Sequence, residues 1–103
     1  MVTFNYNPDR KVFMATFSGR LDTLAVQKLS EIIQVNLPVK DGTSGDKIIF
    51  DMKDVEYISS SFIRICVNVA KQTGSGLFSI TGCQPLIKKT FKISGLDEIL
   101  NVS

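Results

Sequence analysis

The chain has 103 residues, a net charge of +2, 44% hydrophobic residues and 21% charged residues, a composition that predicts one ordinary globular domain over 1–103. So small a net charge gives no electrostatic argument for binding nucleic acid or a membrane surface. The chain contains no histidine, which excludes imidazole metal sites and catalysis by a Ser-His or Cys-His pair.

The two cysteines, Cys66 and Cys83, do not have the spacing of a metal site, so no metal or other cofactor is expected. No apolar run approaches the length of a membrane span, and the first residues lack the basic and apolar pattern of a signal peptide. These features favour a cytoplasmic protein that does not insert into a membrane.

The first two predicted elements form an antiparallel hairpin. Apolar and polar residues alternate from Val2 to Tyr6, and residues 7–10 (Asn-Pro-Asp-Arg) are typical of a turn. Alternation resumes from Val12 to Phe17, and Gly19 is expected to end this second strand.

A first helix follows, because Asp22 or Thr23 can cap its start and Pro38 would end it. Its expected apolar face consists of Ala25, Leu29, Ile32, Ile33, Asn36 and Leu37. The segment 39–46 contains two glycines and reads as a loop.

Residues 47–52 are expected to form a buried third strand, since the centre of this segment is continuously apolar. A short serine-containing loop then leads into a second helix from about Ser60 to Thr73. The apolar residues Ile63, Cys66, Val67 and Ala70 recur at helical spacing and are predicted to be its buried face.

A fourth strand is expected over 77–81, and Pro85 is well suited to the first position of a third helix that ends at Gly95. The order β-β-α-β-α-β-α predicts an α/β fold, a mixed sheet with helices packed mainly on one face, with a right-handed parallel crossover around the second helix. The expected core consists of Phe17, Leu29, Ile33, Ile49, Phe50, Val67, Ile80 and Phe91.

Ser59, Ser60 and Ser61 stand where the third strand gives way to the second helix. Serine is favoured at a helix start because its oxygen can accept a hydrogen bond from a first-turn N–H group. Such a cap is the simplest interpretation of the three serines. The same position favours an anion, so the fold would tolerate a phosphate there.

Several short motifs resemble the STAS domain (sulfate transporter and anti-sigma factor antagonist), in particular its stand-alone anti-sigma factor antagonists. They span nearly the whole chain and comprise Ser18-Gly19-Arg20-Leu21-Asp22, Ile48-Ile49-Phe50-Asp51-Met52, Ile58-Ser59-Ser60-Ser61 and Ser94-Gly95-Leu96-Asp97-Glu98. The resemblance implies the same α/β fold with a mixed sheet.

The resemblance also implies roles for individual residues. Ser60 matches the serine that is phosphorylated in the family, and Ser59, Ser61, Phe62 and Asp22 are the expected contacts with a protein partner. Two positions depart from the family pattern, because Ser59 replaces an aspartate and Phe62 replaces a glycine. Phe62 could either enter the core or remain exposed as an apolar anchor for a partner.

The implied function is a protein-binding switch rather than an enzyme. Antagonists of this family bind an anti-sigma factor, commonly a serine kinase; phosphorylation breaks the complex and a phosphatase restores it. Two alternatives stay open: a STAS docking subunit of a transport or lipid-trafficking complex that is never phosphorylated, and a STAS module that binds a small molecule or nucleotide.

Two other motifs superficially suggest phosphate chemistry. Asp51 follows an apolar strand, as a phosphoacceptor aspartate would, but the chain lacks the acidic pair of a receiver domain, so Asp51 is expected to cap or order the serine loop. Residues 42–47 contain glycines but precede a strand, so they are not a phosphate-binding loop. No catalytic constellation remains.

Overall fold

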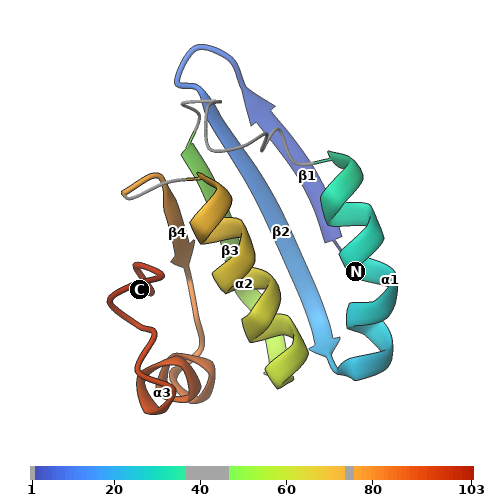
Figure 1. Ribbon diagram of the computed structural model, residues 1–103, viewed down its shortest axis with the longest axis vertical. Coiled ribbons are helices and arrows are strands. Elements are labelled where there is room, and N and C mark those ends of the chain that lie inside the picture. Colours follow the sequence, from blue (N-terminus) through green and yellow to red (C-terminus); the bar gives the residue numbers. More distant parts are fainter. Residues whose placement is uncertain (1, 37–46, 74–75) are drawn as a thin grey trace.

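A computed structural model describes residues 2–36, 47–73 and 76–103 of the chain (Figure 1). Its elements follow the predicted order and are β1 (Val2–Asn7), β2 (Val12–Leu21), α1 (Thr23–Asn36), β3 (Lys47–Ile58), α2 (Ser60–Thr73), β4 (Phe78–Thr81) and α3 (Pro85–Ile93). The predicted loop 39–46 and the predicted helix end at Pro38 lie outside the described residues.

The four strands form one mixed sheet in the order β1-β2-β3-β4. β1 and β2 pair antiparallel, which confirms the predicted hairpin. β2 pairs parallel with β3, and β3 pairs parallel with β4, which confirms the predicted parallel pairing across the α2 connection. The carboxyl ends of β2 and β3 therefore lie side by side at one end of the sheet.

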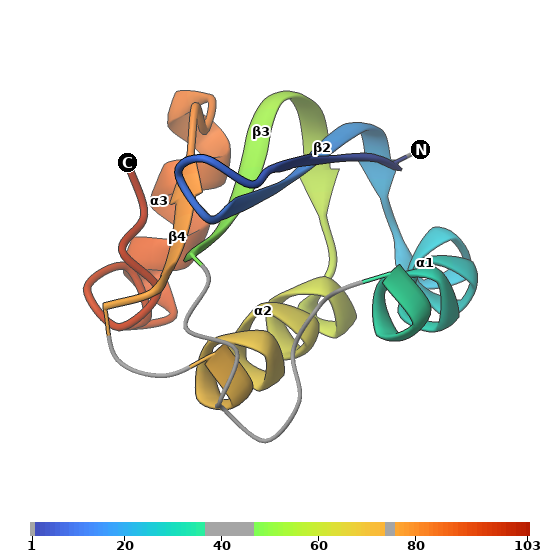
Figure 2. The same cartoon turned by 90° about the horizontal axis from the view of Figure 1, so that it is seen from above.

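Helices α1 and α2 cover one face of this sheet, while α3 lies beside β4 near the carboxyl ends of the parallel strands (Figure 2). Strand residues that pair directly share a face. One such row, Phe4, Ala15, Phe50 and Ile80, crosses all four strands on the side of α1 and α2, and all of its members except Phe4 are fully buried. This face is the centre of the core.

Aromatic rings connect the sheet to α2. The ring centroid of Phe17 lies 4.9 Å from that of Phe50 and 5.2 Å from that of Phe62, in edge-to-face arrangements. Phe50 makes a similar contact with Phe78 at 4.9 Å. Such pairs add about 0.5–1.5 kcal/mol each beyond the burial of their area. Phe62 is thus the main apolar connection between the start of α2 and the sheet.

Six of the eight predicted core residues are buried, and Ile49 and Val67 are only partly buried. Ile49 alternates with the buried Ile48 and Phe50, so it points to the face that α1 and α2 leave open. In α1 the buried residues are Val26, Leu29 and Ile33. The predicted burial of Ile32 and Asn36 is wrong, because both lie on the exposed side of α1.

The buried face of α2 is centred one position away from the prediction. Its buried residues are Phe62, Cys66, Val69 and Thr73, while the predicted Ile63, Val67 and Ala70 are partly buried along one flank. The helix has this orientation because Phe62 inserts between the rings of β2 and β3. Its predicted range, Ser60 to Thr73, is confirmed.

Two strands run further than predicted. β2 continues past Gly19 to Leu21, and β3 continues past Met52 to Ile58. The pairing between them shifts register twice near Gly19, whose φ of 82° is accessible to glycine at low cost. The prediction that Gly19 ends the second strand is therefore wrong. Gly19 adjusts the path of β2, which continues to Leu21.

Candidate functional site

The candidate site lies where the extended parts of β2 and β3 end together. Leu21 pairs with Ile58, and the backbone N–H of Ser59 donates to the carbonyl of Leu21 at 2.9 Å. Each strand leads almost directly into a helix, so the N-termini of α1 and α2 start next to each other (Figure 1). Both helices present the positive end of their backbone dipole at this place.

Each helix is capped by the residue that precedes it. The Asp22 carboxylate accepts the backbone N–H of Ala25 at 2.9 Å, and the Asp22 carbonyl accepts that of Val26 at 2.9 Å. At α2 the Ser59 carbonyl accepts from Phe62 at 3.1 Å, and the Ser59 hydroxyl is 3.4 Å from the same N–H. Asp22 and Ser59 thus hold the two helix starts in place.

The three serines have different environments. Ser59 is only 7% exposed and caps α2, Ser60 is exposed, and Ser61 is half-buried on the side of α1. Within the described parts of the chain, no side-chain hydrogen bond involves the Ser60 hydroxyl. Ser60 is therefore the serine that presents an accessible hydroxyl directly at the helix start.

Two of the predicted partner contacts need correction. Phe62 is 0% exposed, so the prediction that it contacts a partner is wrong for this structure; it takes the alternative role, that of a core residue. Ser59 offers almost no surface because its backbone and hydroxyl are both engaged at the junction of β3 and α2. Ser61 and Asp22 keep some exposed surface next to Ser60.

A groove runs between α1 and α2 from this site. Near the helix starts, a hollow of about 480 Å³ is bordered by Thr23, Gln27 and Glu31 of α1 and by Ser61 and Arg64 of α2. A second hollow of about 420 Å³ continues it toward the helix ends, and both hollows share Ser30, Ile65 and Asn68.

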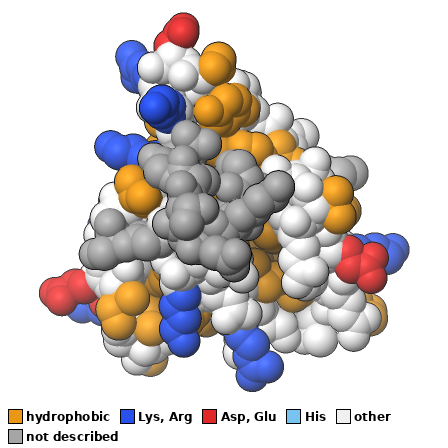
Figure 3. Space-filling view, turned by 45° about the horizontal axis from the view of Figure 1, so that its top comes forward, with side chains coloured by type: hydrophobic (Ala, Val, Ile, Leu, Met, Phe, Trp, Pro, Cys, Tyr) orange, Lys and Arg blue, Asp and Glu red, His pale blue; other side chains and the backbone are white. Residues whose placement is uncertain are grey.

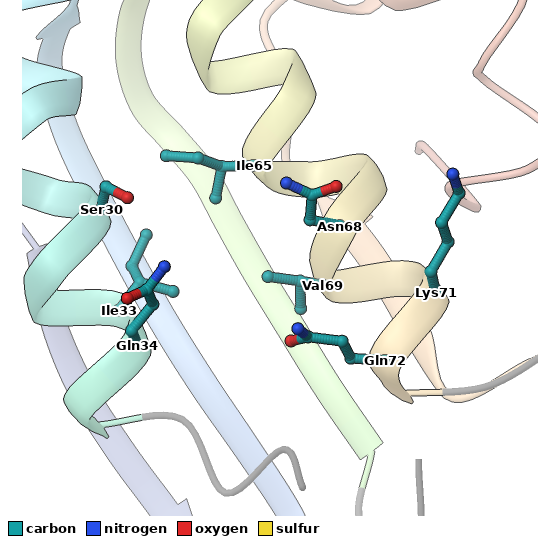
Figure 4. Close-up of a pocket in the computed structure, with 8 residues that line it drawn as sticks. All are labelled: Ser30, Ile33, Gln34, Ile65, Asn68, Val69, Lys71 and Gln72. Carbon is teal, nitrogen blue, oxygen red and sulfur yellow. The ribbon is translucent and has the colours of Figure 1, made fainter. Parts of the chain in front are cut away.

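Figure 4 shows this second hollow. Ile65 extends toward α1, whereas Lys71 points away from it. Apolar side chains (Ile33, Val69) lie beneath amide side chains (Gln34, Gln72), so the groove has an apolar floor and a mainly polar rim.

Arg20 and Tyr57 were missed in the sequence. They pair across β2 and β3, and the Arg20 guanidinium lies 4.7 Å from the centre of the Tyr57 ring. Such a cation–π contact stabilises by about 0.5–1 kcal/mol at an exposed site. It adds a basic and an aromatic side chain at the strand ends that lead to Asp22 and Ser59. The pair was not detectable, because it exists only if both strands continue beyond their predicted ends.

Asp51 does not reach the serines. Its carboxylate accepts the backbone N–H of Lys53 at 3.1 Å, and β3 carries the chain on to Ile58 before the serines begin. The expectation that Asp51 caps or orders the serine segment is therefore wrong, since the predicted loop between them is a strand.

The two thiols are both held in the protonated form. Burial raises the pKa of Cys66 well above its usual value, with a further contribution from Cys83. The pKa of Cys83 is raised to about 11 by partial burial, which outweighs the lowering effect of Lys88. A thiolate is the reactive form of cysteine, so neither side chain has the character of a nucleophile near neutral pH.

In the described parts of the chain, no three acidic or cysteine side chains converge in a way that could hold a metal ion. None of the described helices is long and apolar enough to cross a membrane. On the face shown in Figure 3, basic and acidic side chains both occur around the periphery, and outside the grey residues neither sign gathers into one large patch.

Comparisons with known proteins agree with this geometry. Among solved structures, an anti-sigma factor antagonist from Mycobacterium paratuberculosis superposes with a TM-score of 0.76 at 17% identity, covering 99% of this chain and 85% of that one. The anti-sigma factor antagonist SpoIIAA in its unphosphorylated form superposes with a TM-score of 0.60 at 16% identity, covering 90% and 83%. At these identities the likeness shows a shared fold.

A search of curated proteins finds no match. The sequence profile of the STAS domain, however, matches residues 6–103, which is almost the whole chain. The strand and helix order, the paired helix starts after β2 and β3 and this match lead to one conclusion: the protein belongs to the STAS domain family.

Proposed function

We propose that this protein is an anti-sigma factor antagonist, a switch that docks an anti-sigma factor or a serine kinase through the surface around Ser60. The observation that carries the proposal is the exposed Ser60 hydroxyl at the first position of α2, beside the start of α1. Two structurally similar proteins are themselves named anti-sigma factor antagonists, which supports the same role here.

Phosphorylation of Ser60 is the proposed control. A phosphate there would add a charge of about −1.5 to −2 and would be tolerated by the first-turn N–H groups of α2. Arg64 is exposed and lies one turn further along α2. Side chains four residues apart are neighbours on a helix surface, so the Arg64 guanidinium could pair with a phosphate on Ser60. The same dianion in a docked interface must lose its water, and any acidic partner group opposite it would repel it. Phosphorylation of Ser60 would thus leave the fold intact and weaken the complex with the partner.

The proposed contact surface consists of Ser60, Ser61, Asp22 and Arg64, with Thr23 bordering the same groove. Ser61 and Arg64 point to the α1 side, so a partner that covers Ser60 would also meet the groove between the helices. The buried Phe62 takes no direct part in this surface. It supports the surface from below by anchoring α2 to the sheet.

The protein is proposed to act by binding rather than by catalysis, in the cytoplasm where sigma factors act. Three features support a non-enzymatic role: the sequence has no histidine, both thiols are protonated near neutral pH, and within the described residues no hydrogen bond joins the exposed Ser60 hydroxyl to a base. A phosphatase that removes the phosphate would complete the cycle.

The test incubates the protein with ATP and an anti-sigma factor of the serine-kinase type, and mass spectrometry then locates any phosphate. We expect phosphate on Ser60, and we expect Ser60→Ala to bind the kinase and resist release by ATP. Ser60→Glu should fold normally and bind more weakly. Ser61→Ala is the matched control, because it removes the neighbouring hydroxyl and should leave the modification in place.

Two outcomes would change the proposal. Phosphate on Ser61 alone would move the modified residue into the groove while keeping the mechanism. A complex that persists in ATP with no phosphate on any of the three serines would retire the switch and favour the STAS docking subunit that is never phosphorylated.

A further inference from the structure

Arg20 and Tyr57 form an ordered pair of exposed side chains at the ends of β2 and β3. The two residues are register partners, and the Arg20 guanidinium lies over the Tyr57 ring, 4.7 Å from its centre. Arg20 is exposed, and Tyr57 is 42% exposed. A guanidinium that rests on an aromatic face keeps the N–H groups at its edge available for other partners. The pair therefore presents a positioned cation to solvent.

The Arg20 guanidinium has no anionic partner in the described part of the chain. No hydrogen bond or ion pair there engages its N–H groups, although Asp54 and Glu56 of β3 are exposed nearby in the sequence. The Asp22 carboxylate, two residues after Arg20, is used to cap α1. The N–H donors of a guanidinium form a fixed fork that matches a carboxylate, which can accept two of them at once. The free fork therefore favours an acidic group from outside the chain.

The pair lies close to the proposed docking surface. Tyr57 precedes Ser60 by three residues, so their Cα atoms are no more than about 11 Å apart. The hydrogen bond from the Ser59 N–H to the Leu21 carbonyl joins the same two strand ends. A standard interface covers about 800 Å² on each partner, which is a patch wide enough to include Ser60 and the pair. A protein that docks on Ser60 can therefore also reach Arg20.

Arg20 points away from the core, whereas α2 packs on the core side. Neighbouring residues of a strand point to opposite faces, and Leu21, next to Arg20, is fully buried in the core. Arg64, by contrast, lies on α2 itself, one turn after Ser60. The two arginines are thus suited to different anions. Arg64 is placed for a phosphate on Ser60, and Arg20 is placed for a group of the docked protein.

We propose that Arg20, held in place by Tyr57, binds a carboxylate of the protein that docks on Ser60. This contact rests on the proposed function, and it extends the docking surface from the helix starts to the ends of β2 and β3. The tyrosine ring orients the guanidinium before binding, so the complex has less side-chain motion to restrict. Arginine and tyrosine are also among the residues that most often dominate the energy of protein interfaces.

The test measures the dissociation constant of the complex with an anti-sigma factor of the serine-kinase type by calorimetry, without ATP, so that Ser60 stays unmodified. Arg20→Ala should raise this constant by roughly 10- to 100-fold. Lys47→Ala is the matched control, because it removes an exposed positive charge at the opposite end of β3 and should change the constant by less than about threefold. Both side chains are exposed, so both variants should fold, which circular dichroism checks.

Further variants separate the contributions of charge, fork and ring. Arg20→Lys keeps the charge without the planar fork, so it should recover only part of the affinity that Arg20→Ala loses. Arg20→Glu should bind more weakly than Arg20→Ala, because two carboxylates would then face each other. Tyr57→Phe keeps the ring and should bind within about twofold of the wild type, whereas Tyr57→Leu should bind more weakly. Binding of Arg20→Glu as tight as that of Arg20→Ala would show that the facing group is not acidic and would overturn the proposal.

The outcomes separate this contact from the proposed switch. If the wild type binds and Ser60→Glu weakens the complex, but Arg20→Ala and Lys47→Ala behave alike, the Arg20 contact is overturned and the switch stands. If Arg20→Ala changes only the behaviour of protein phosphorylated on Ser60, Arg20 serves that phosphate, and the contact with a partner carboxylate is again overturned. If the wild type does not bind the anti-sigma factor, the proposed function and the Arg20 contact both fail.

Discussion

The starts of α1 and α2 are built alike and differ in what they expose. Each follows a buried strand-end residue, Leu21 or Ile58, and each is capped by a short polar side chain. At α1 the cap is a carboxylate, and the second helical residue, Leu24, is 74% exposed. At α2 the cap is a nearly buried hydroxyl, and the third helical residue, Phe62, is fully buried.

The two helix starts therefore share one structural plan and differ in charge. The start of α1 carries its own negative charge at Asp22, which occupies the positive end of the helix. The start of α2 is capped by an uncharged serine, which leaves the positive end of that helix without a charged cap beside the exposed Ser60, the residue proposed here to be phosphorylated. Three predictions test this difference.

Phe62→Ala should have the largest effect. The ring is fully buried between Phe17 and Phe50, so its removal should lower the free energy of unfolding by about 3–5 kcal/mol. Leu24→Ala at the start of α1 is the matched control and should change it by less than about 0.5 kcal/mol. Urea denaturation followed by circular dichroism measures both. A similar loss in both variants would mean that the two helix starts are anchored alike.

Removing the caps should have an intermediate effect that differs between the helices. Asp22→Ala should cost about 1–2 kcal/mol, because it removes a 2.9 Å bond from a charged acceptor. Ser59→Ala should cost about 0.5–1 kcal/mol, because the 3.4 Å hydroxyl contact is weak and the Ser59 carbonyl still accepts the same N–H. Denaturation of Asp22→Asn, which keeps an accepting oxygen, controls for the change of side chain. A larger loss of stability for Ser59→Ala than for Asp22→Ala would show that Ser59, and not Asp22, is the stronger cap.

A new charge at the first helical position should have the smallest effect. Ser60→Glu should raise the stability of the fold by about 0.3–1 kcal/mol at low salt, since the N-terminus of α2 has no charged cap. Thr23→Glu, the equivalent change in α1, should add less, because Asp22 already supplies a carboxylate next to it. Thermal unfolding at low and high salt compares the two, and salt should reduce both effects. An equal gain at both positions would show that the native charge of Asp22 does not distinguish the helices.

The local sequence was enough to predict the elements. Alternating residues in 2–6 and 12–17 predict a hairpin, and the helix from Ser60 to Thr73 was placed correctly from its serine start and apolar spacing. The position of Ser60 at that helix start follows from the same pattern. These features depend on residues close together in the chain, so a single sequence can reveal them.

Only the tertiary structure decided which side chains face the core and which form the site. Phe62 is buried because rings on β2 and β3 leave a space that fits it, and this choice also sets the orientation of α2. The Arg20–Tyr57 contact and the nearness of Asp22 to the serines depend on the parallel register of β2 and β3 beyond Gly19 and Met52. Such pairings join residues far apart in the sequence, and no local pattern specifies them.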